Sequence, residues 1–140
     1  MKRHFQNFDY YSKYLGETGL TFIAYSKENE SFQTEYRSYS FTMWEGYSNN
    51  LFLKLTKSSD YIDLPLFVKN WNECKGWRWD DIPDKINEME IDWLLAKLPK
   101  IKFETENSPE KVYFDFLPDF IFFIESVKDL NLELKISDDY

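Results

Sequence analysis

Three acidic side chains near the middle of the chain have a spacing that could hold a metal ion. Asp80, Asp81 and Asp84 form a D-D-x-x-D pattern, which would bring carboxylates close to one another, as a hard cation such as Mg²⁺ requires. A structural interpretation is also open, because Pro83 places these acids at the start of a helix, where the helix dipole favours negative charge. We favour this second interpretation, so the sequence predicts neither a metal site nor a cofactor.

An aromatic pair precedes these acids. Trp77 and Trp79 bracket Arg78, and this combination could form an aromatic cage or a stacking platform, because Trp and Arg are the usual anchors of binding hot spots. Residues of this kind also fill the junction between two helices. We expect at least one of the two tryptophans to lie in the core, and the role of the other stays open.

The sequence gives little support for covalent catalysis. His4 is the only histidine and Cys74 the only cysteine, so Ser-His-Asp or Cys-His chemistry and a His-rich metal site have no second histidine to draw on. Glycine-rich phosphate loops, C-x-x-C pairs and H-E-x-x-H helices are absent from the sequence. Two carboxylates could still cleave a glycan, but some pair among the chain's 25 acids will always have a suitable separation. The sequence therefore favours a protein that is not an enzyme.

The acids belong to a predicted helix from Asp81 to Leu98, which Pro99 ends. At about 100° per residue, one narrow stripe of this helix is apolar and is predicted to face the core. The stripe comprises Ile82, Ile86, Met89, Trp93 and Ala96. The opposite side is acidic at its beginning and apolar at its end. It carries Asp80, Asp81, Asp84, Glu88 and Asp92, and then Ile91, Leu95 and Leu98.

Two arrangements of this opposite side remain open. In the first, a second layer of the protein covers the apolar end while the acidic beginning stays in water. In the second, the whole side is exposed, and an apolar centre rimmed with carboxylates is the anatomy of a site for a basic protein partner. The candidate partner-binding residues are Asp80, Asp81, Asp84, Glu88, Asp92, Trp77, Arg78 and Trp79.

The rest of the chain alternates between strand-like and helix-like patterns. Residues 1–15 predict a short amphipathic helix or an aromatic arm, and Asp63 is expected to cap a helix that Gly76 stops. A further helix is predicted from Pro118 to Asp129. Strands are predicted at 20–26, 31–37, 38–44, 51–56, 100–104, 111–116 and 130–136, with a polar loop at 45–50. Together these elements indicate one α+β domain over residues 1–140, with a mainly antiparallel sheet and helices packed on one face.

The net negative charge arises entirely from the second half of the chain. Residues 1–70 carry eight acids and eight Lys or Arg residues, whereas residues 71–140 carry seventeen acids against nine Lys or Arg residues. A field of this sign repels phosphate backbones and anionic membranes and attracts basic protein surfaces. We therefore expect no nucleic-acid partner and no membrane partner.

Three sequence features bear on the compartment. The start of the chain is a poor secretory signal, because no apolar segment follows its basic residues. The longest uninterrupted apolar run, Phe120 to Ile124, is far below the roughly 20 residues that span a bilayer. The single Cys74 can form no internal disulfide. These features predict a cytoplasmic protein, and its oligomeric state stays open.

In composition the chain resembles the immunity proteins of bacterial polymorphic toxin systems, including those of contact-dependent growth inhibition. The resemblance rests on small size, the lopsided negative charge, the segment DDIPDKINEMEID at 80–92 and the W-R-W bracket. It implies a protein that binds one cognate toxin domain, often a basic nuclease, and blocks its active site or a nearby surface. The acids of 80–92 would pair with Lys or Arg of the toxin while Trp79 fills a pocket.

Two other functions remain open from the sequence. One is a small enzyme that acts on a glycan through carboxylates, and the other is a structural or adaptor subunit. An enzyme should have a concave pocket that contains a carboxylate with a raised pKa, whereas an inhibitor should present an open acidic surface. A structural subunit should bury its acids in permanent contacts.

Overall fold

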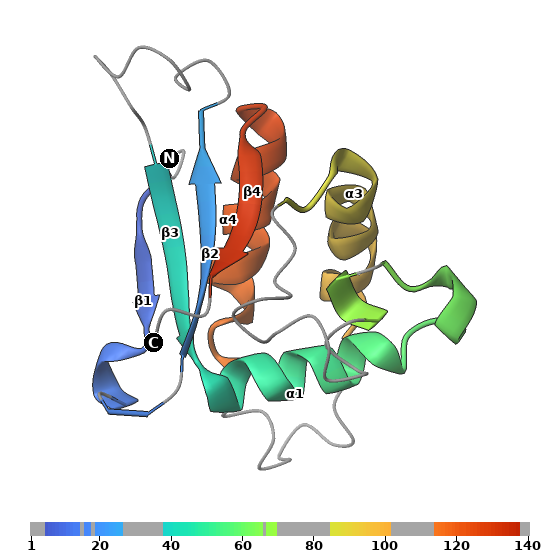
Figure 1. Ribbon diagram of the computed structural model, residues 1–140, viewed down its shortest axis with the longest axis horizontal. Helices are drawn as coiled ribbons and strands as arrows, with labels where there is room; N and C mark the ends of the chain where they lie inside the picture. Colours follow the sequence, from blue (N-terminus) through green and yellow to red (C-terminus); the bar gives the residue numbers. More distant parts are fainter. Residues whose placement is uncertain are drawn as a thin grey trace.

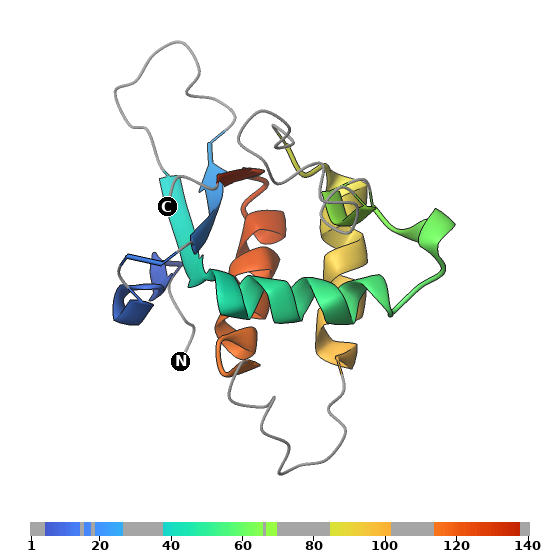
Figure 2. The same ribbon diagram turned by 60° about the horizontal axis from the view of Figure 1, so that its bottom comes forward.

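The computed structural model describes residues 5–14, 16–17, 19–26, 38–65, 67–69, 85–101 and 114–137. Within these ranges an open sheet lies against helix α4 (Leu117–Asp129), and helix α3 (Glu88–Lys97) packs on the side of α4 that faces away from the sheet (Figures 1 and 2). Helix α1 (Glu45–Thr56) crosses one end of these layers, as Figure 1 shows. The structure confirms the predicted α+β fold with a mainly antiparallel sheet and helices on one face.

The sheet has four strands in the order β1-β3-β2-β4. They are β1 (Phe8–Tyr10), β2 (Gly19–Tyr25), β3 (Ser38–Trp44) and β4 (Glu133–Ser137). Strand β2 pairs antiparallel with both β3 and β4, whereas β1 pairs parallel with β3. The strands predicted at 20–26 and 38–44 are confirmed, and so is the last strand from residue 133 onward.

Of the two alternatives predicted for residues 1–15, an amphipathic helix or an aromatic arm, the helix is wrong for the described residues. Instead β1 forms an edge strand, and a short 3₁₀ helix, η1 (Ser12–Tyr14), follows it. The spacing of Phe5, Phe8 and Tyr11 suggested a helix because all three side chains point toward the protein. Phe8 and Tyr11 are buried, and Phe5 stacks on Tyr39 with ring centroids 4.2 Å apart.

Helix α1 (Glu45–Thr56) replaces both the strand predicted at 51–56 and the polar loop predicted at 45–50. Leu51, Phe52 and Leu55 taken alone resemble a strand, but Tyr47 and Ser48 extend the same buried side by one turn toward the N-terminus. The buried positions therefore recur every three or four residues, as in a helix. Intervals this regular outweigh the turn-forming tendency of the polar residues at 48–50.

A connecting segment leads from α1 to a short helical stretch. It contains a 3₁₀ helix, η4 (Tyr61–Asp63), and residues 67–69 are helical. Leu64, Phe67 and Val68 are buried, as their predicted helical spacing requires. Asp63 lies in η4, and the remainder of the helix predicted to end at Gly76 lies outside the described residues.

Helix α3 (Glu88–Lys97) begins later than the predicted start at Asp81. Ile86 does not belong to the helix, because its N–H donates to the carbonyl of Leu134 at 2.8 Å and forms an isolated bridge to β4. Asn87 caps the helix by accepting from the N–H of Glu90 at 2.9 Å, and the Glu90 carboxylate accepts from the N–H of Asn87 at 3.0 Å. The predicted end is confirmed, because a 3₁₀ helix, η5 (Leu98–Lys100), that contains Pro99 follows α3.

Helix α4 (Leu117–Asp129) agrees with its prediction and carries the centre of the core. Phe120, Phe123, Ile124 and Val127 are all buried along one side. The strand predicted at 111–116 is wrong where it is described, because residues 114–116 form a turn before α4. The strand predicted at 100–104 begins inside η5, and residues 102–104 lie outside the described ranges.

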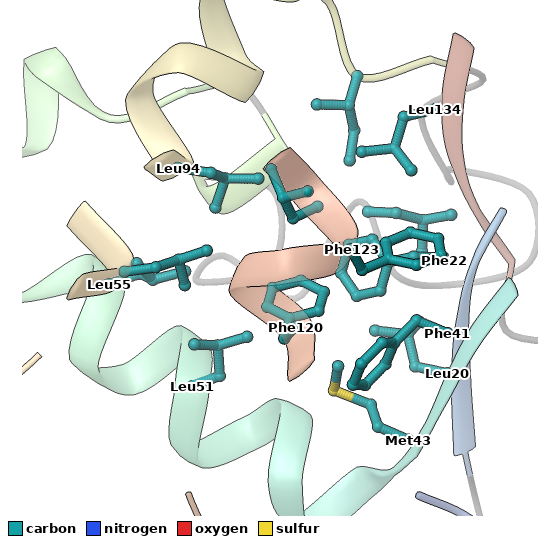
Figure 3. Packing of buried hydrophobic residues seen from close by; sticks show 14 of the residues in the cluster. Leu20, Phe22, Phe41, Met43, Leu51, Leu55, Leu94, Phe120, Phe123 and Leu134 are labelled. Carbon is teal, nitrogen blue, oxygen red and sulfur yellow. The ribbon is translucent and has the colours of Figure 1, made fainter. Parts of the chain in front are cut away.

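Phenylalanine rings join the sheet to α4. Phe120 lies 5.1 Å from Phe41 of β3 and 5.0 Å from Phe22 of β2, measured between ring centroids. Figure 3 shows Phe120 between the sheet and Leu51 of α1. Complete burial of each such ring contributes about 2–3 kcal/mol to folding, so this cluster fixes the positions of α1, α3 and α4 relative to the sheet. Among the helices of the described ranges, none has the length and apolar character needed to cross a membrane.

Candidate functional site

The far side of α3 follows the first of the two arrangements left open by the sequence. Its apolar residues Ile91 and Leu98 are buried, as is Leu94, whereas Glu88 and Asp92 are exposed.

The predicted core stripe is wrong at two positions of α3. Met89, which was predicted to be in the core, is 81% exposed, and Ala96 is exposed as well. The predicted core stripe included Ile86, which lies in extended backbone before the helix. The direction of the Ile86 side chain therefore does not follow the rotation of 100° per residue that applies inside α3, and it gives the wrong orientation for the helix.

The outer side of α3 forms a surface that we call the α3 ridge. Its residues are exposed and lie within an arc of roughly 100° on a helical wheel. They are Glu88, Met89, Asp92 and Ala96. Trp93 borders the ridge and is partly buried against the core. A large apolar side chain, Met89, thus stands in water at one edge of the ridge, beside the carboxylates of Glu88 and Asp92.

A cleft of about 450 Å³ lies along one flank of the ridge, between the start of α3 and the segment that follows η4. We call it the α3 cleft. The described residues that line it are Asp63, Pro65, Phe67, Lys85, Asn87, Met89, Glu90 and Trp93. Its walls are predominantly apolar, and two carboxylates and one ammonium group stand among them. Lys85 faces Glu133 of β4, with Nζ 3.8 Å from the nearer carboxylate oxygen.

A smaller hollow of about 170 Å³ lies along the other flank, between α3 and α4. Asp92 accepts a hydrogen bond from the ammonium group of Lys128 there, and the pair joins the two helices. This hydrogen bond, together with the negative charge of Asp92, raises the pKa of Lys128 above its ordinary value. Asp92 is therefore already engaged within the molecule, and a cation of any partner must compete with Lys128 for it.

Two of the predicted site residues lie together in the structure. Glu88 and Asp92 are one helical turn apart on the α3 ridge, and both are exposed. The other six predicted site residues lie outside the described ranges. They are Asp80, Asp81, Asp84, Trp77, Arg78 and Trp79.

Sequence reasoning missed Met89 and Trp93, which it assigned to the core. One signal could have placed them correctly. Asn87 followed three residues later by Glu90 is the pattern of a capping box, which marks a helix start at residue 88. A helix phased from that start turns Ile91, Leu94 and Leu98 inward together, and Met89 then lies on the outside.

A second groove, of about 480 Å³, lies at the other side of the molecule, beside β1 and β3. Asp9 lines it, and its carboxylate accepts from the N–H of Tyr11 at 2.8 Å and from the N–H of Ser12 at 2.9 Å. These backbone donors lower the pKa of Asp9, and the Tyr11 N–H has the larger effect. A carboxylate that stays ionised and holds a turn in place has the properties of a structural acid. It lacks the raised pKa expected of a general acid.

Within the described residues, His, Cys, Asp and Glu side chains form no group of three or more that could hold a metal ion. Comparison of the chain with protein-family models, with curated proteins and with solved structures finds no match. The α3 ridge with its adjoining cleft is therefore selected as the candidate site on its geometry alone.

Proposed function

We propose that this is a non-enzymatic, cytoplasmic binding protein that binds and neutralises a basic bacterial toxin domain, as immunity proteins do. The observation that carries the proposal is the exposed side chain of Met89 at the edge of the α3 ridge, beside Glu88 and Asp92. An apolar centre with a charged rim is the usual anatomy of a protein interface. The acids of the rim select a partner surface rich in Lys and Arg.

The energetics of Met89 support a protein partner. A Met side chain that moves from water into an apolar contact contributes about 1.5–3 kcal/mol, and in the free protein most of this side chain remains in water. Trp93, partly exposed beside it, belongs to the residue type most enriched in binding hot spots. A partner that covers both side chains recovers this free energy on binding.

The charge of the whole chain supports the same class of partner. The net charge is −8 at pH 7, and the excess lies entirely in residues 71–140, which include α3. A concentrated negative field speeds the approach of a basic protein and slows the approach of an acidic one. The electrostatic field attracts the partner before contact, whereas Met89 and Trp93 pack against the partner after contact.

The proposal is tested by affinity capture of the tagged protein from its native cells at low and high salt, with bound proteins identified by mass spectrometry. We expect one stoichiometric basic partner, whose capture weakens as salt rises. The purified partner should lose its toxic activity when it is mixed with the wild-type protein. Absence of an enriched basic partner at both salt concentrations would contradict the proposal.

Two matched variants locate the surface in the same experiment. Glu88→Lys reverses one charge on the α3 ridge. Glu17→Lys makes the same change on an exposed residue of the β1–β2 connection, on the opposite side of the molecule from α3 (Figure 1). Capture should fall for Glu88→Lys and stay near the wild-type level for Glu17→Lys. Equal loss in both variants would show that only the total charge matters.

A further inference from the structure

The α3 cleft differs from an ordinary surface depression in the nature of its walls. Phe67 is buried at its base, whereas Met89 and Trp93 remain accessible along its side. Met is unbranched and polarizable, so its side chain adapts to the shape of an incoming apolar group. Trp offers a flat face that takes either an apolar group or a cation. These walls suit an apolar side chain that enters from a partner.

The charges at the cleft favour a cation beside that apolar group. Among the described lining residues the charged ones are Asp63, Lys85 and Glu90. The ammonium group of Lys85 lies close to Glu133, outside the cleft lining, which offsets its positive charge. Glu90 accepts from the N–H of Asn87, which is an uncharged donor. Asp63 and Glu90 together therefore give the cleft a net negative field.

We propose that the α3 cleft receives one apolar side chain of the partner that has Lys or Arg next to it in the partner's sequence. The apolar group packs on Met89 and Trp93, and the neighbouring cation faces Asp63 and Glu90. This assignment rests on the proposed function, because it specifies what the basic partner presents to the protein. It also makes the cleft, more than the outer acids of α3, the place where partners are discriminated.

A direct test uses capped peptides of defined chemistry and methyl NMR. The chain has three methionines, and among them Met43 is fully buried, so its methyl signal is an internal reference for Met89. The probes are Ac-Lys-Lys-Leu-Lys-Lys-NH₂, the acidic analogue Ac-Glu-Glu-Leu-Glu-Glu-NH₂, and Ac-Lys-Lys-Gly-Lys-Lys-NH₂, which lacks the apolar group. The basic leucine peptide should shift the Met89 methyl and the Trp93 indole in a saturable way and leave Met43 unchanged.

The two control peptides separate the two parts of the proposal. The glycine peptide should bind about tenfold more weakly, because it lacks the group that packs on Met89. The acidic peptide should cause no saturable shift. Asp63→Asn with Glu90→Gln, in which Gln can still serve as the capping partner of Asn87, should weaken the basic leucine peptide about two- to fivefold. Equal shifts with the basic and acidic peptides, or no saturable shift with either, would overturn the assignment.

Comparison with the capture experiment distinguishes failure of the cleft from failure of the function. If the basic partner is captured and Met89→Asp captures it equally well, the proposed function stands and the cleft assignment is wrong. If no basic partner is captured while the basic leucine peptide still shifts Met89, the cleft recognises this chemistry but the toxin-neutralising function is wrong. The circular dichroism spectrum of Met89→Asp should match that of the wild type, since the side chain is 81% exposed.

Discussion

At the scale of single residues, Asp9 shows how one carboxylate shapes the chain around it. Its side chain accepts from the backbone N–H groups of Tyr11 and Ser12, and this turn directs the ring of Tyr11 back toward β2. The ring lies so close to Gly19 that a Cβ at that position would be 2.9 Å from it. The hydroxyl of Tyr11 then donates to the carbonyl of Glu17, which closes the connection.

The lowered pKa of Asp9 makes this turn sensitive to acid. A carboxyl whose pKa is lower in the folded state than in the unfolded state stabilises the fold above about pH 4, and this contribution disappears as the pH falls through the folded-state pKa. We predict that Asp9→Asn, whose amide oxygen still accepts from Tyr11, changes stability at pH 7 by less than about 1 kcal/mol. Between about pH 4 and pH 2, the variant should lose less stability than the wild type.

Urea unfolding at a series of pH values measures this difference directly. Asp9→Ala provides the matched comparison, because it removes the acceptor as well as the charge, and it should be less stable than Asp9→Asn at pH 7. Identical acid dependence in the wild type and Asp9→Asn would contradict the assigned role of the carboxylate.

At the scale of elements, the start of α1 contains a close contact between Gly46 and Trp44 that the sequence alone does not reveal. Gly46 lies in the first turn of the helix, and the indole ring of Trp44 occupies the space beside it. A Cβ at position 46 would be 2.2 Å from the nearest atom of that ring. The glycine therefore lets Trp44 fold over the helix start, where its ring also meets Tyr47 at 5.7 Å between centroids.

This contact predicts a reversed mutational effect. On helix propensity alone, Gly46→Ala would stabilise α1 by about 1 kcal/mol. Because the new methyl group must displace the indole, we expect Gly46→Ala to destabilise the protein by about 1–3 kcal/mol instead. In a Trp44→Ala background the obstruction is gone, and the same substitution should become stabilising. Chemical denaturation of the four proteins in this cycle tests the prediction, and a Gly46→Ala effect of the same sign in both backgrounds would refute it.

The elements that could be predicted from sequence are those whose regularly spaced apolar residues all face the core. In α4, Phe120, Phe123, Ile124 and Val127 follow a helical period and all face the core, so the sequence predicts both the helix and its buried side. Strands β2 and β3 were predictable for the same reason, since their alternating residues line one buried face.

The elements that sequence reasoning missed depend on contacts distant in the chain. The parallel pairing of β1 with β3 joins Phe8 to Phe41, and no local pattern encodes that choice of neighbour. Ile86 continues the apolar spacing of α3, yet its hydrogen bond to Leu134 removes it from the helix. Because the sequence prediction placed Ile86 inside the helix, it assigned Met89 to the core. Glu88 and Asp92 were correctly predicted to be exposed, since acidic side chains favour water wherever the helix begins. Exposure of Met89 could be predicted only from the correct helix start.

At the scale of the whole molecule, the proposed function gives the layers and the charge separate roles in partner binding. The sheet and α4 form the aromatic core, and α3 lies in the layer furthest from the sheet (Figure 2). This placement keeps the outer side of α3 accessible, and two acids of the second half of the chain, Glu88 and Asp92, are exposed there. In the proposed function, long-range attraction and short-range packing therefore act on the same surface but at different stages of binding.

We therefore predict that substitutions on the α3 ridge affect different rate constants for the captured basic partner. Glu88→Lys should slow association several-fold and reduce its salt dependence, because it weakens the field that guides the encounter. Met89→Ala should leave the association rate nearly unchanged and speed dissociation about tenfold, because it removes packing that forms only after contact. Surface plasmon resonance at two or more salt concentrations separates the two effects, with Glu17→Lys as the charge-matched control. If Glu88→Lys changed only dissociation, or Met89→Ala changed only association, the assignment of steering to the acids and of packing to Met89 would be wrong.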